Sequence, residues 1–175
     1  MHCEGRSSIV FTFEEFQNNH LHLLRQWLNA DHIKDHWQET EDDEKLKKKF
    51  IEELPLRGVS AFIILKNKTP IGYIQYYDAK RVGGGWWEQE SPGTFGIDLM
   101  IGMVEFHGRG LGAQIIKEFV SFVRSKEPFL KTIIIDPDPK NFRAVRAFEK
   151  AGFVAESEVQ TPVGTALLMR MKFED

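Results

Sequence analysis

The sequence predicts a mixed α/β fold of the α+β kind: one largely antiparallel sheet with a local parallel segment and helices on both faces. Three observations lead to this expectation. Short runs rich in β-branched and aromatic residues alternate with stretches whose apolar residues recur at helical spacing. A glycine cluster at 108–112 joins one such run directly to one such stretch. Near the end of the chain, runs at 153–160 and 166–173 flank turn residues and predict a closing hairpin.

The composition is typical of an ordinary globular chain. Its 175 residues suffice for one core, so we expect a single domain over residues 1–175. With 23 basic and 26 acidic residues the net charge is −3, which gives no basic footprint for nucleic acid or membrane but suits a small cationic substrate. A lone cysteine, Cys3, excludes a disulfide framework and a metal quartet. Since neither a transmembrane segment nor a signal peptide is recognisable, we expect a cytoplasmic protein.

Strand and helix patterns alternate along the first half of the chain. The expected elements are a strand over 7–13, a helix over 14–28, a charged amphipathic helix over 41–54, a hairpin of strands over 59–66 and 70–78, and a loop over 79–94. Pro55 and Gly58 are expected to end the second helix. His20 and His22 are expected to be exposed on the first helix. His32 and His36 have a metal-site spacing but lack the intervening glutamate, so no metal site is expected.

The second half is organised around a glycine loop. The expected elements are a central strand over 95–102, a helix from Leu111, a strand over 131–135, a helix from the cap residue Asn141 to Ala151, and the closing hairpin. The loop itself is His107-Gly108-Arg109-Gly110-Leu111-Gly112. Backbone N–H groups at a helix N-terminus can bind a phosphate, but the spacing matches neither the P-loop nor the dinucleotide fingerprint. A phosphate cradle and a structural turn are both open on this observation alone.

Two other stretches carry unusual side chains. Asp98 lies between two aliphatic residues of the central strand, where an unpaired buried carboxylate costs several kcal/mol. The segment 83–90 combines three glycines with two adjacent tryptophans and two acids. It can border a pocket, or it can be a hairpin tip with one buried indole. Trp37 likewise is either a core residue or a platform that faces a ligand.

Two motifs and the element order make the chain resemble the GCN5-related N-acetyltransferase (GNAT) superfamily. The motifs are Gly108-Arg109-Gly110-Leu111-Gly112, between its strand and helix, and Asn141-x-x-Ala144-x-x-x-Phe148-Glu149-Lys150-Ala151-Gly152-Phe153. Within the superfamily the chain looks most like aminoglycoside 6′-N-acetyltransferases over nearly its whole length. The stretches that carry this likeness are Trp27-Leu28-Asn29, His32-Ile33, Trp37, Pro70-Ile71-Gly72-Tyr73, Gly85-Trp86-Trp87-Glu88, Gly96-Ile97-Asp98 and Asp136-Pro137-x-Pro139.

The resemblance implies a GNAT-type sheet in which the strand of Asp98 and the strand of Lys131 splay apart. The resulting cleft would accept the pantetheine arm of acetyl-coenzyme A (acetyl-CoA) as cosubstrate, with no metal. Backbone N–H groups of the loop would hold the pyrophosphate, and Asn141 would contact the pantetheine or the loop beyond it. The implied cofactor-binding residues are Met100, Ile101, His107, Gly108, Arg109, Gly110, Leu111, Gly112 and Asn141. Homodimers are common in such folds.

The chemistry can be argued from the residues themselves. An alkylamine is mostly protonated near neutral pH and must lose a proton before it attacks a thioester. A carboxylate can hold the ammonium and then accept its proton, and Asp98 is the candidate base. The oxyanion would lie on a backbone N–H near Met100 or Ile101. Acids bind the amines of a polycation and indoles stack on sugars or ammonium groups, so the candidate substrate-binding residues are Trp37, Trp86, Trp87, Glu88, Glu90 and Asp136.

The chain departs from the family pattern in three places. Phe148 stands where many members have a tyrosine that protonates the leaving thiolate; because a thiol pKa is about 8.5, this lowers the expected rate without forbidding the reaction. His107 replaces the usual Gln or Arg, which a loop that works through backbone donors tolerates. Gly84 and Val163 supply no carboxylate in the two loops beside the cleft. Substrate identity is therefore less constrained than cofactor identity.

The first functional hypothesis is direct acetyl transfer from acetyl-CoA to a primary amine of an aminoglycoside-like substrate. A related hypothesis is acylation of another small amine, such as a polyamine or a siderophore hydroxylamine. A third, of a different class, is a non-catalytic acyl-CoA-binding module. Asp98 and the acidic, aromatic character of the cleft argue against the third hypothesis, whereas Phe148 argues weakly for it.

Overall fold

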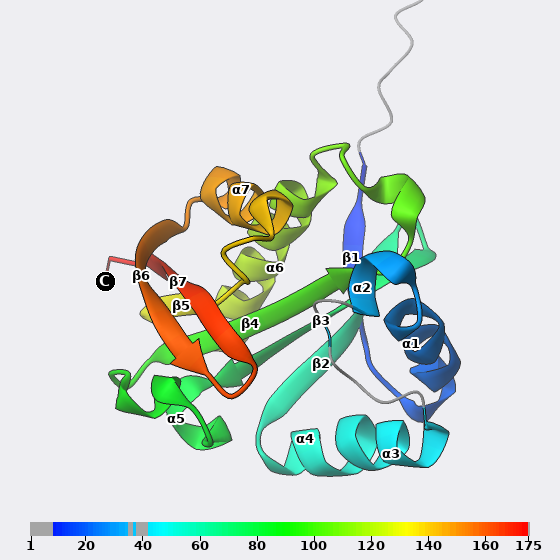
Figure 1. Ribbon diagram of the computed structural model, residues 1–175, viewed down its shortest axis with the longest axis horizontal. Helices are drawn as coiled ribbons and strands as arrows, with labels where there is room; N and C mark the ends of the chain where they lie inside the picture. Colours follow the sequence, from blue (N-terminus) through cyan, green and yellow to red (C-terminus); the bar gives the residue numbers. More distant parts are fainter. Residues whose placement is uncertain (1–8, 35–36, 38–41, 175) are drawn as a thin grey trace, which may run out of the picture.

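The computed structural model describes residues 9–34, 37 and 42–174, and its centre is one seven-stranded sheet (Figure 1). The strands follow the spatial order β1-β2-β3-β4-β5-β7-β6, and every neighbouring pair is antiparallel except β4 and β5. Their bounds are β1 Phe11–Glu15, β2 Val59–Lys66, β3 Thr69–Asp78, β4 Thr94–Ile101, β5 Thr132–Ile135, β6 Val154–Thr161 and β7 Gly164–Lys172. The expected mostly antiparallel sheet with one parallel segment is confirmed.

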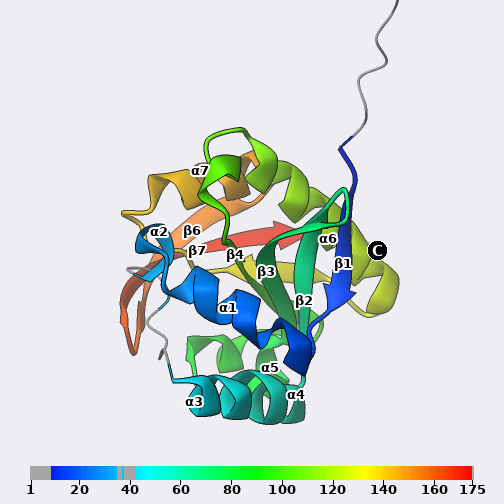
Figure 2. The same cartoon turned by 90° about the vertical axis from the view of Figure 1, so that its right-hand side faces the viewer.

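Helices cover both faces of the sheet (Figures 1 and 2). The α-helices are α1 Leu21–Leu28, α2 Asp31–Lys34, α3 Asp43–Lys47, α4 Leu54–Leu56, α5 Ala79–Val82, α6 Leu111–Lys126 and α7 Phe142–Ala151. Short 3-10 turns lie at Asn18–His20, Trp86–Gln89 and Val104–Phe106, and Lys48–Glu53 is π-helical. Among the described residues, no helix is long and apolar enough to cross a membrane.

Two large hydrophobic clusters, one on each face, hold these layers together. Ile115 and Phe119 of α6 and Phe148 of α7 pack with strand residues such as Ile74 and Ile97 on one face. On the other face α1 and the helical segment 43–56 cover a second cluster around the fully buried Tyr73. The alternation of side chains along β3 and β4 thus sends one set of residues to each cluster.

The parallel pair β4 and β5 is joined over a short stretch only. Thr94, Phe95 and Gly96 pair with residues 132–134, while the rest of β4, to Ile101, pairs with β3 alone. Beyond Gly96 the two strands part, and β4 leads to the glycine loop and α6. The splayed strands implied by the resemblance are therefore present.

The strand expected over 7–13 and the helix expected over 14–28 have different bounds in the structure, where β1 is Phe11–Glu15 and α1 is Leu21–Leu28. The helix expected over 14–28 begins only at Leu21, because Glu14 and Glu15 continue β1 and pair with β2. His20 is 8% exposed rather than on the surface. Its Nδ1 accepts a hydrogen bond from the backbone N–H of Gln17 at 3.0 Å, and its Nε2 lies 3.2 Å from a carboxylate oxygen of Glu14. A local 3-10 turn, which has no strong sequence signature, thus replaces the first part of the expected helix.

The second expected helix and the loop at 79–94 also differ in detail. Helical structure runs over 43–56, so Pro55 lies within the last turn, where its fixed φ is acceptable, and Gly58 at φ 81° ends the segment. Residue 41, the expected start, lies outside the described residues. The loop over 79–94 contains α5 and a 3-10 turn, because Asp78 Oδ1 accepts hydrogen bonds from the N–H groups of Lys80 and Arg81 at 2.9 and 3.1 Å.

Candidate active site

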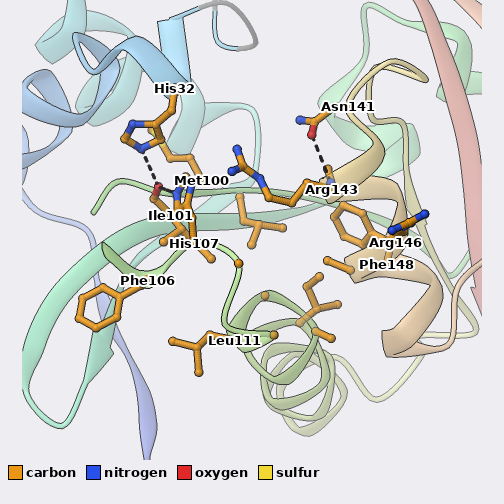
Figure 3. A pocket seen from close by; sticks show the side chains of 18 of the residues that line it. His32, Met100, Ile101, Phe106, His107, Leu111, Asn141, Arg143, Arg146 and Phe148 are labelled. Atoms are coloured by element: carbon orange, nitrogen blue, oxygen red, sulfur yellow. Dashed lines mark hydrogen bonds between the residues drawn. The ribbon is translucent and has the colours of Figure 1, made fainter. Parts of the chain in front are cut away.

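A cavity of about 480 Å³ opens where β4 and β5 part (Figure 3). Its walls are the end of β4, the glycine loop with the start of α6, and α7; α2 and Trp37 close one side. Eight of the nine implied cofactor-binding residues line it: Met100, Ile101, His107, Gly108, Gly110, Leu111, Gly112 and Asn141. The side chain of Arg109, the ninth, does not line the cavity.

Two glycines of the loop require their backbone conformation. Gly108 has φ 70°, and Gly110, the residue before α6, has φ 73°. A Cβ added at either position would meet nothing within 4 Å, so the surrounding space is open and the constraint is conformational. Such a loop at a helix N-terminus offers free N–H groups and open space to an anion.

A basic face on α7 forms the opposite wall, and sequence analysis missed it. Arg143, Arg146 and Lys150 line the cavity, and Arg143 extends from α7 toward the side where His107 lies (Figure 3). Their i, i+3, i+7 spacing places all three on one helical face. This spacing was the sequence signal for the basic face. The family motif in the same helix is defined by Asn141 and by buried apolar residues and does not include these cations.

Asn141 fixes the start of that helix. Its Oδ1 accepts a hydrogen bond from the Ala144 N–H at 3.2 Å, as an N-cap does. Gly152, at φ 108°, ends the helix as expected. The Asn141 side chain therefore orients α7 and also lies at the wall of the cavity.

Two histidines hold the end of β4. The Nε2 atoms of His32 and His107 lie 3.3 and 2.9 Å from the carbonyl oxygen of Ile101, and their rings meet edge to face at 4.5 Å. Burial lowers the pKa of His107, and the nearby charge of Arg143 lowers it further. His36, the other half of the considered metal pair, lies outside the described residues; no group of three or more His, Cys, Asp and Glu side chains suited to a metal occurs in the part of the chain that the structure describes.

Asp98 sits at the end of a buried hydrogen-bond chain. The hydroxyl of Tyr73 donates to Gln75 Oε1 at 2.6 Å, and Gln75 Nε2 donates to Asp98 Oδ2 at 2.8 Å. Gln75 and Asp98 are directly opposite each other in the β3–β4 register, and Tyr73 lies on the same face. Because Tyr73 commits the amide oxygen, the amide nitrogen must face the carboxylate.

The electrostatic setting of Asp98 suits a base that works near neutral pH. Burial and, to a smaller extent, the charge of Asp136 raise the pKa of Asp98 to about 7. The hydrogen bond from Gln75 and the charge of Lys49 act in the opposite direction. A carboxylate with such a pKa both binds a cation and accepts its proton.

The segment 83–90 contacts Asp136, the acid whose charge acts on Asp98. Trp86 Nε1 donates to Asp136 Oδ2 at 3.2 Å, and burial raises the pKa of Asp136. Trp87 Nε1 donates to the Gly83 carbonyl at 3.3 Å, and its ring packs 6.3 Å from that of Tyr77. Both indoles are partly buried and pack against the cluster of Ala79, Ile134 and Leu168, so this segment is not a hairpin tip with a single buried indole.

The two glutamates of that segment are engaged within the protein. The Glu88 carboxylate accepts a hydrogen bond from the Gly84 N–H. Glu90 is bound by Arg170, with Nη1–Oε2 and Nη2–Oε1 distances of 2.7 and 2.8 Å. Neither glutamate lines the cavity, and neither do Asp98, Trp86, Trp87 and Asp136; of the implied substrate residues, only Trp37 does. Trp37 meets the ring of Tyr73 edge to face at 5.9 Å.

Phe148 occupies the position of the missing tyrosine. It is 4% exposed, lines the cavity and packs against Phe153 with ring centroids 5.4 Å apart. The phenyl ring offers no proton at this position. The structure thus has a cleft with anion-binding loop and basic wall, and a poised carboxylate on the strand that leads into it.

Comparison with known proteins decides the family. The model of the acetyltransferase (GNAT) domain matches residues 17–161. This chain belongs to the GNAT acetyltransferase family. It is therefore an acyltransferase, and the splayed strands and the glycine loop are those of a GNAT cleft.

Named relatives narrow the likeness within the GNAT family. Aminoglycoside N(6′)-acetyltransferase type 1 of Klebsiella pneumoniae is 38% identical over 162 residues, which cover 88% of this chain and 80% of that protein. The kanamycin resistance protein of Rhizobium radiobacter is 40% identical over 95 residues, 52% of this chain and 87% of that protein. A solved structure of aminoglycoside acetyltransferase AAC(6′)-Ib in complex with coenzyme A and kanamycin superposes with a TM-score of 0.85 at 35% identity, covering 93% of this chain and 95% of that one.

Proposed function

We propose that this GNAT domain, residues 1–175, transfers the acetyl group of acetyl-CoA directly to the 6′-amine of an aminoglycoside. The observation that carries the proposal is the pairing of an anion-binding cleft with a poised carboxylate on one strand, β4. The aminoglycoside acetyltransferase relatives, one of them solved with coenzyme A and kanamycin, support both the cosubstrate and the substrate class.

The residues of the cleft suit acetyl-CoA. The open space at Gly108 and Gly110 leaves room for a pyrophosphate against backbone N–H groups. Arg143, Arg146 and Lys150 supply positive charge along the opposite wall. The apolar side chains of Leu99 and Ile116, among others, also line the cavity and suit the pantetheine arm.

In the proposed reaction Asp98 acts as the general base. Its carboxylate holds the 6′-ammonium and accepts one proton, directly or through water, and the free amine then attacks the thioester carbonyl. A C–N bond forms, the acylated nitrogen loses its second proton to water, the C–S bond breaks, and the coenzyme A thiolate leaves. Backbone N–H groups near Met100 or Ile101 stabilise the oxyanion. Since Phe148 has no proton to give, water protonates the thiolate. No covalent enzyme intermediate or metal takes part.

The amine end favours a polycationic substrate over a neutral one. Asp98 and Asp136 are two carboxylates close enough for the charge of one to raise the pKa of the other. A bound ammonium group relieves that repulsion, which is a gain specific to cations. Trp37, at the cavity wall, offers an indole face for a sugar ring or an ammonium group.

The proposal is tested by acetyl-CoA-dependent thiol release against kanamycin, tobramycin, spermidine and a hydroxylamine substrate. Rapid release with aminoglycosides that carry a free 6′-amine, lost when that amine is blocked, is the expected result. Preference for spermidine or the hydroxylamine would instead identify an acyltransferase for another small amine. Binding of acetyl-CoA with no release across the panel would contradict the proposal and favour a binding module.

A further inference from the structure

Arg170 lies at the centre of an ion-pair network that the reaction scheme does not use. Its Nη1 and Nη2 atoms bind both carboxylate oxygens of Glu90, and its Nε lies 2.9 and 3.0 Å from the two oxygens of Glu156. The side chains of Arg170 and Glu90 are 13% and 15% exposed, whereas that of Glu156 is 36% exposed. Glu90 is thus the inner partner and Glu156 the outer one.

The Glu90 contact ties a distant loop to the C-terminal hairpin. Arg170 belongs to β7, where it pairs with Ile134 of β5, and Glu90 directly follows the 3-10 turn Trp86–Gln89. At the other end of the same turn, the Trp86 indole donates to Asp136, just beyond β5. The turn is therefore fastened at both ends to the half of the sheet that lies beyond the β4–β5 split.

The Arg170–Glu90 ion pair fixes the position and orientation of the Trp86–Gln89 turn, in addition to holding the turn against the sheet. The small apolar cluster of Ala79, Ile134 and Leu168 already packs against Trp86 and Trp87, so apolar contacts alone would keep the turn near the sheet. Apolar contacts tolerate sliding, whereas a guanidinium that meets both oxygens of a carboxylate fixes distance and orientation together. A partly buried ion pair is weak evidence for stability but a recurrent device for structural specificity.

We propose that Arg170 is a positioning residue for the amine substrate: through Glu90 it holds the Trp86–Gln89 turn, and with it the Trp86–Asp136 contact, in the place where the turn borders the substrate. The inference rests on the proposed function, because the turn faces a substrate only if the amine binds beside Asp98 and Asp136. It also assigns Glu90 an internal role, in contrast to direct contact with an amine.

The two roles of Glu90 predict opposite results for one substitution. We call the Arg170–Glu90 pair, in its positioning role, the clamp. If Glu90 acts in the clamp, Arg170→Gln and Glu90→Gln both release the turn and raise the KM for kanamycin by about the same factor, of order tenfold. If Glu90 binds the amine directly, Arg170→Gln frees its carboxylate and lowers that KM, while Glu90→Gln raises it. The clamp leaves the KM for acetyl-CoA within about twofold in both variants, because neither the turn nor Arg170 lines the cofactor cleft.

The matched control is Glu156→Gln, which removes the outer carboxylate of the same arginine and is expected to leave the KM for kanamycin within about twofold. The exchanged pair, Glu90→Arg with Arg170→Glu, restores part of the lost affinity under the clamp and none under direct amine binding. A general loss of structure would raise both KM values and lower the melting temperature together, and would overturn the inference, as would unchanged kanamycin kinetics in Arg170→Gln.

A second measurement keeps the inference separate from the proposed function. Acrylamide quenching of tryptophan fluorescence should increase in Arg170→Gln and Glu90→Gln but not in Glu156→Gln, because only the first two release Trp86 and Trp87. If wild-type protein acetylates no aminoglycoside, the proposed function fails, while the quenching result still decides whether the clamp exists. If wild-type protein is active and neither KM nor quenching changes in Arg170→Gln, the clamp alone is refuted.

Discussion

The two ends of the proposed active site recognise opposite charges with different parts of the chain. The cofactor end uses backbone N–H groups of one glycine loop and cationic side chains of one helix, α7. The amine end uses carboxylates from β4 and from the segment after β5, steadied by side chains of β3, β7 and the loop after β3. None of these side chains at the amine end lines the cavity, so in the proposed site a polyanionic cofactor and a polycationic substrate do not compete for the same groups.

The largest expected effect follows from loss of the base at the amine end alone. Asp98→Asn removes the base while keeping size and hydrogen-bonding capacity, so kcat with kanamycin should fall by about 10²–10⁴-fold. Affinity for acetyl-CoA, measured by calorimetry, should be unchanged. Asp43→Asn is the control, since Asp43 is an exposed residue of α3 that pairs with Arg25. Turnover retained in Asp98→Asn would remove this residue from the mechanism.

The next effect breaks the cofactor end alone. Gly110→Val forces a β-branched residue to φ 73° and places its side chain in the open space of the loop. The KM for acetyl-CoA should rise by about 10–100-fold, with little change in the KM for kanamycin. Gly164→Val controls for backbone strain, since Gly164 also has a positive φ and open surroundings but is the first residue of β7. Equal effects of the two variants would refute the phosphate cradle.

A smaller effect tests the basic wall. Arg143→Gln and Arg146→Gln should each raise the KM for acetyl-CoA about three- to tenfold, and the increase should shrink at high salt because it is electrostatic. Lys117→Gln, on the surface of α6 away from this cavity, serves as the control. A salt-independent effect would indicate that the arginines act through helix packing rather than through charge.

The dependence of kcat/KM on pH tests the pKa of Asp98. With a pKa of about 7, the base is protonated and inactive at lower pH, so kcat/KM should fall as pH drops through 7. The Gln75 hydrogen bond lowers this pKa, and Gln75→Leu should therefore move the midpoint to higher pH and reduce the rate at pH 7 more than at pH 9. Tyr73→Phe, which removes the hydrogen bond to Gln75 Oε1 but keeps the bond from Gln75 to Asp98, should move the midpoint less. A pH profile that does not shift in Gln75→Leu would contradict the role of the Gln75 hydrogen bond in setting the pKa of Asp98.

The smallest effect concerns stability. Burial raises the pKa of Asp98 in the folded state above its ordinary value of 3.8, so the charged form destabilises the fold progressively as pH rises from about 4 through 7. Asp98→Asn should therefore melt a few degrees above wild type at pH 8, taking about 2–4 °C per kcal/mol for a chain of this size. At pH 4, where Asp98 is protonated in the folded protein, the difference should vanish. A lower melting temperature of the variant at pH 8 would contradict this sign.

Sequence alone predicted the lining of the cavity far better than the contacts around Asp98 and Asp136, for a physical reason. The glycine loop and the α7 motif are local: positive φ, an N-cap and a helical period each leave a signature within a few residues. Even the missed Arg143–Arg146–Lys150 face was readable from its spacing. The Glu90–Arg170 pair joins residues 80 apart in the chain, and no local pattern announces it.

The strand register lies between these extremes. Alternation along β3 places Tyr73 and Gln75 on one face, but only the pairing with β4 puts Gln75 opposite Asp98. The segment 79–94 was expected to be a loop because of its glycines and acids, but Asp78 caps a short helix, α5, at its start. Contacts set by register and by loop docking are thus where sequence reasoning fell short.

The central claim is acetylation of a 6′-amine with Asp98 as base, and the most direct measurement is the structure of the product. Kanamycin is incubated with acetyl-CoA and wild-type protein, and the product is analysed by mass spectrometry and NMR, with Asp98→Asn as the blank. The account predicts a single added acetyl group on the 6′ nitrogen with wild type and only traces with the variant. An acetyl group on another nitrogen, or the same product at the same rate from Asp98→Asn, would contradict it.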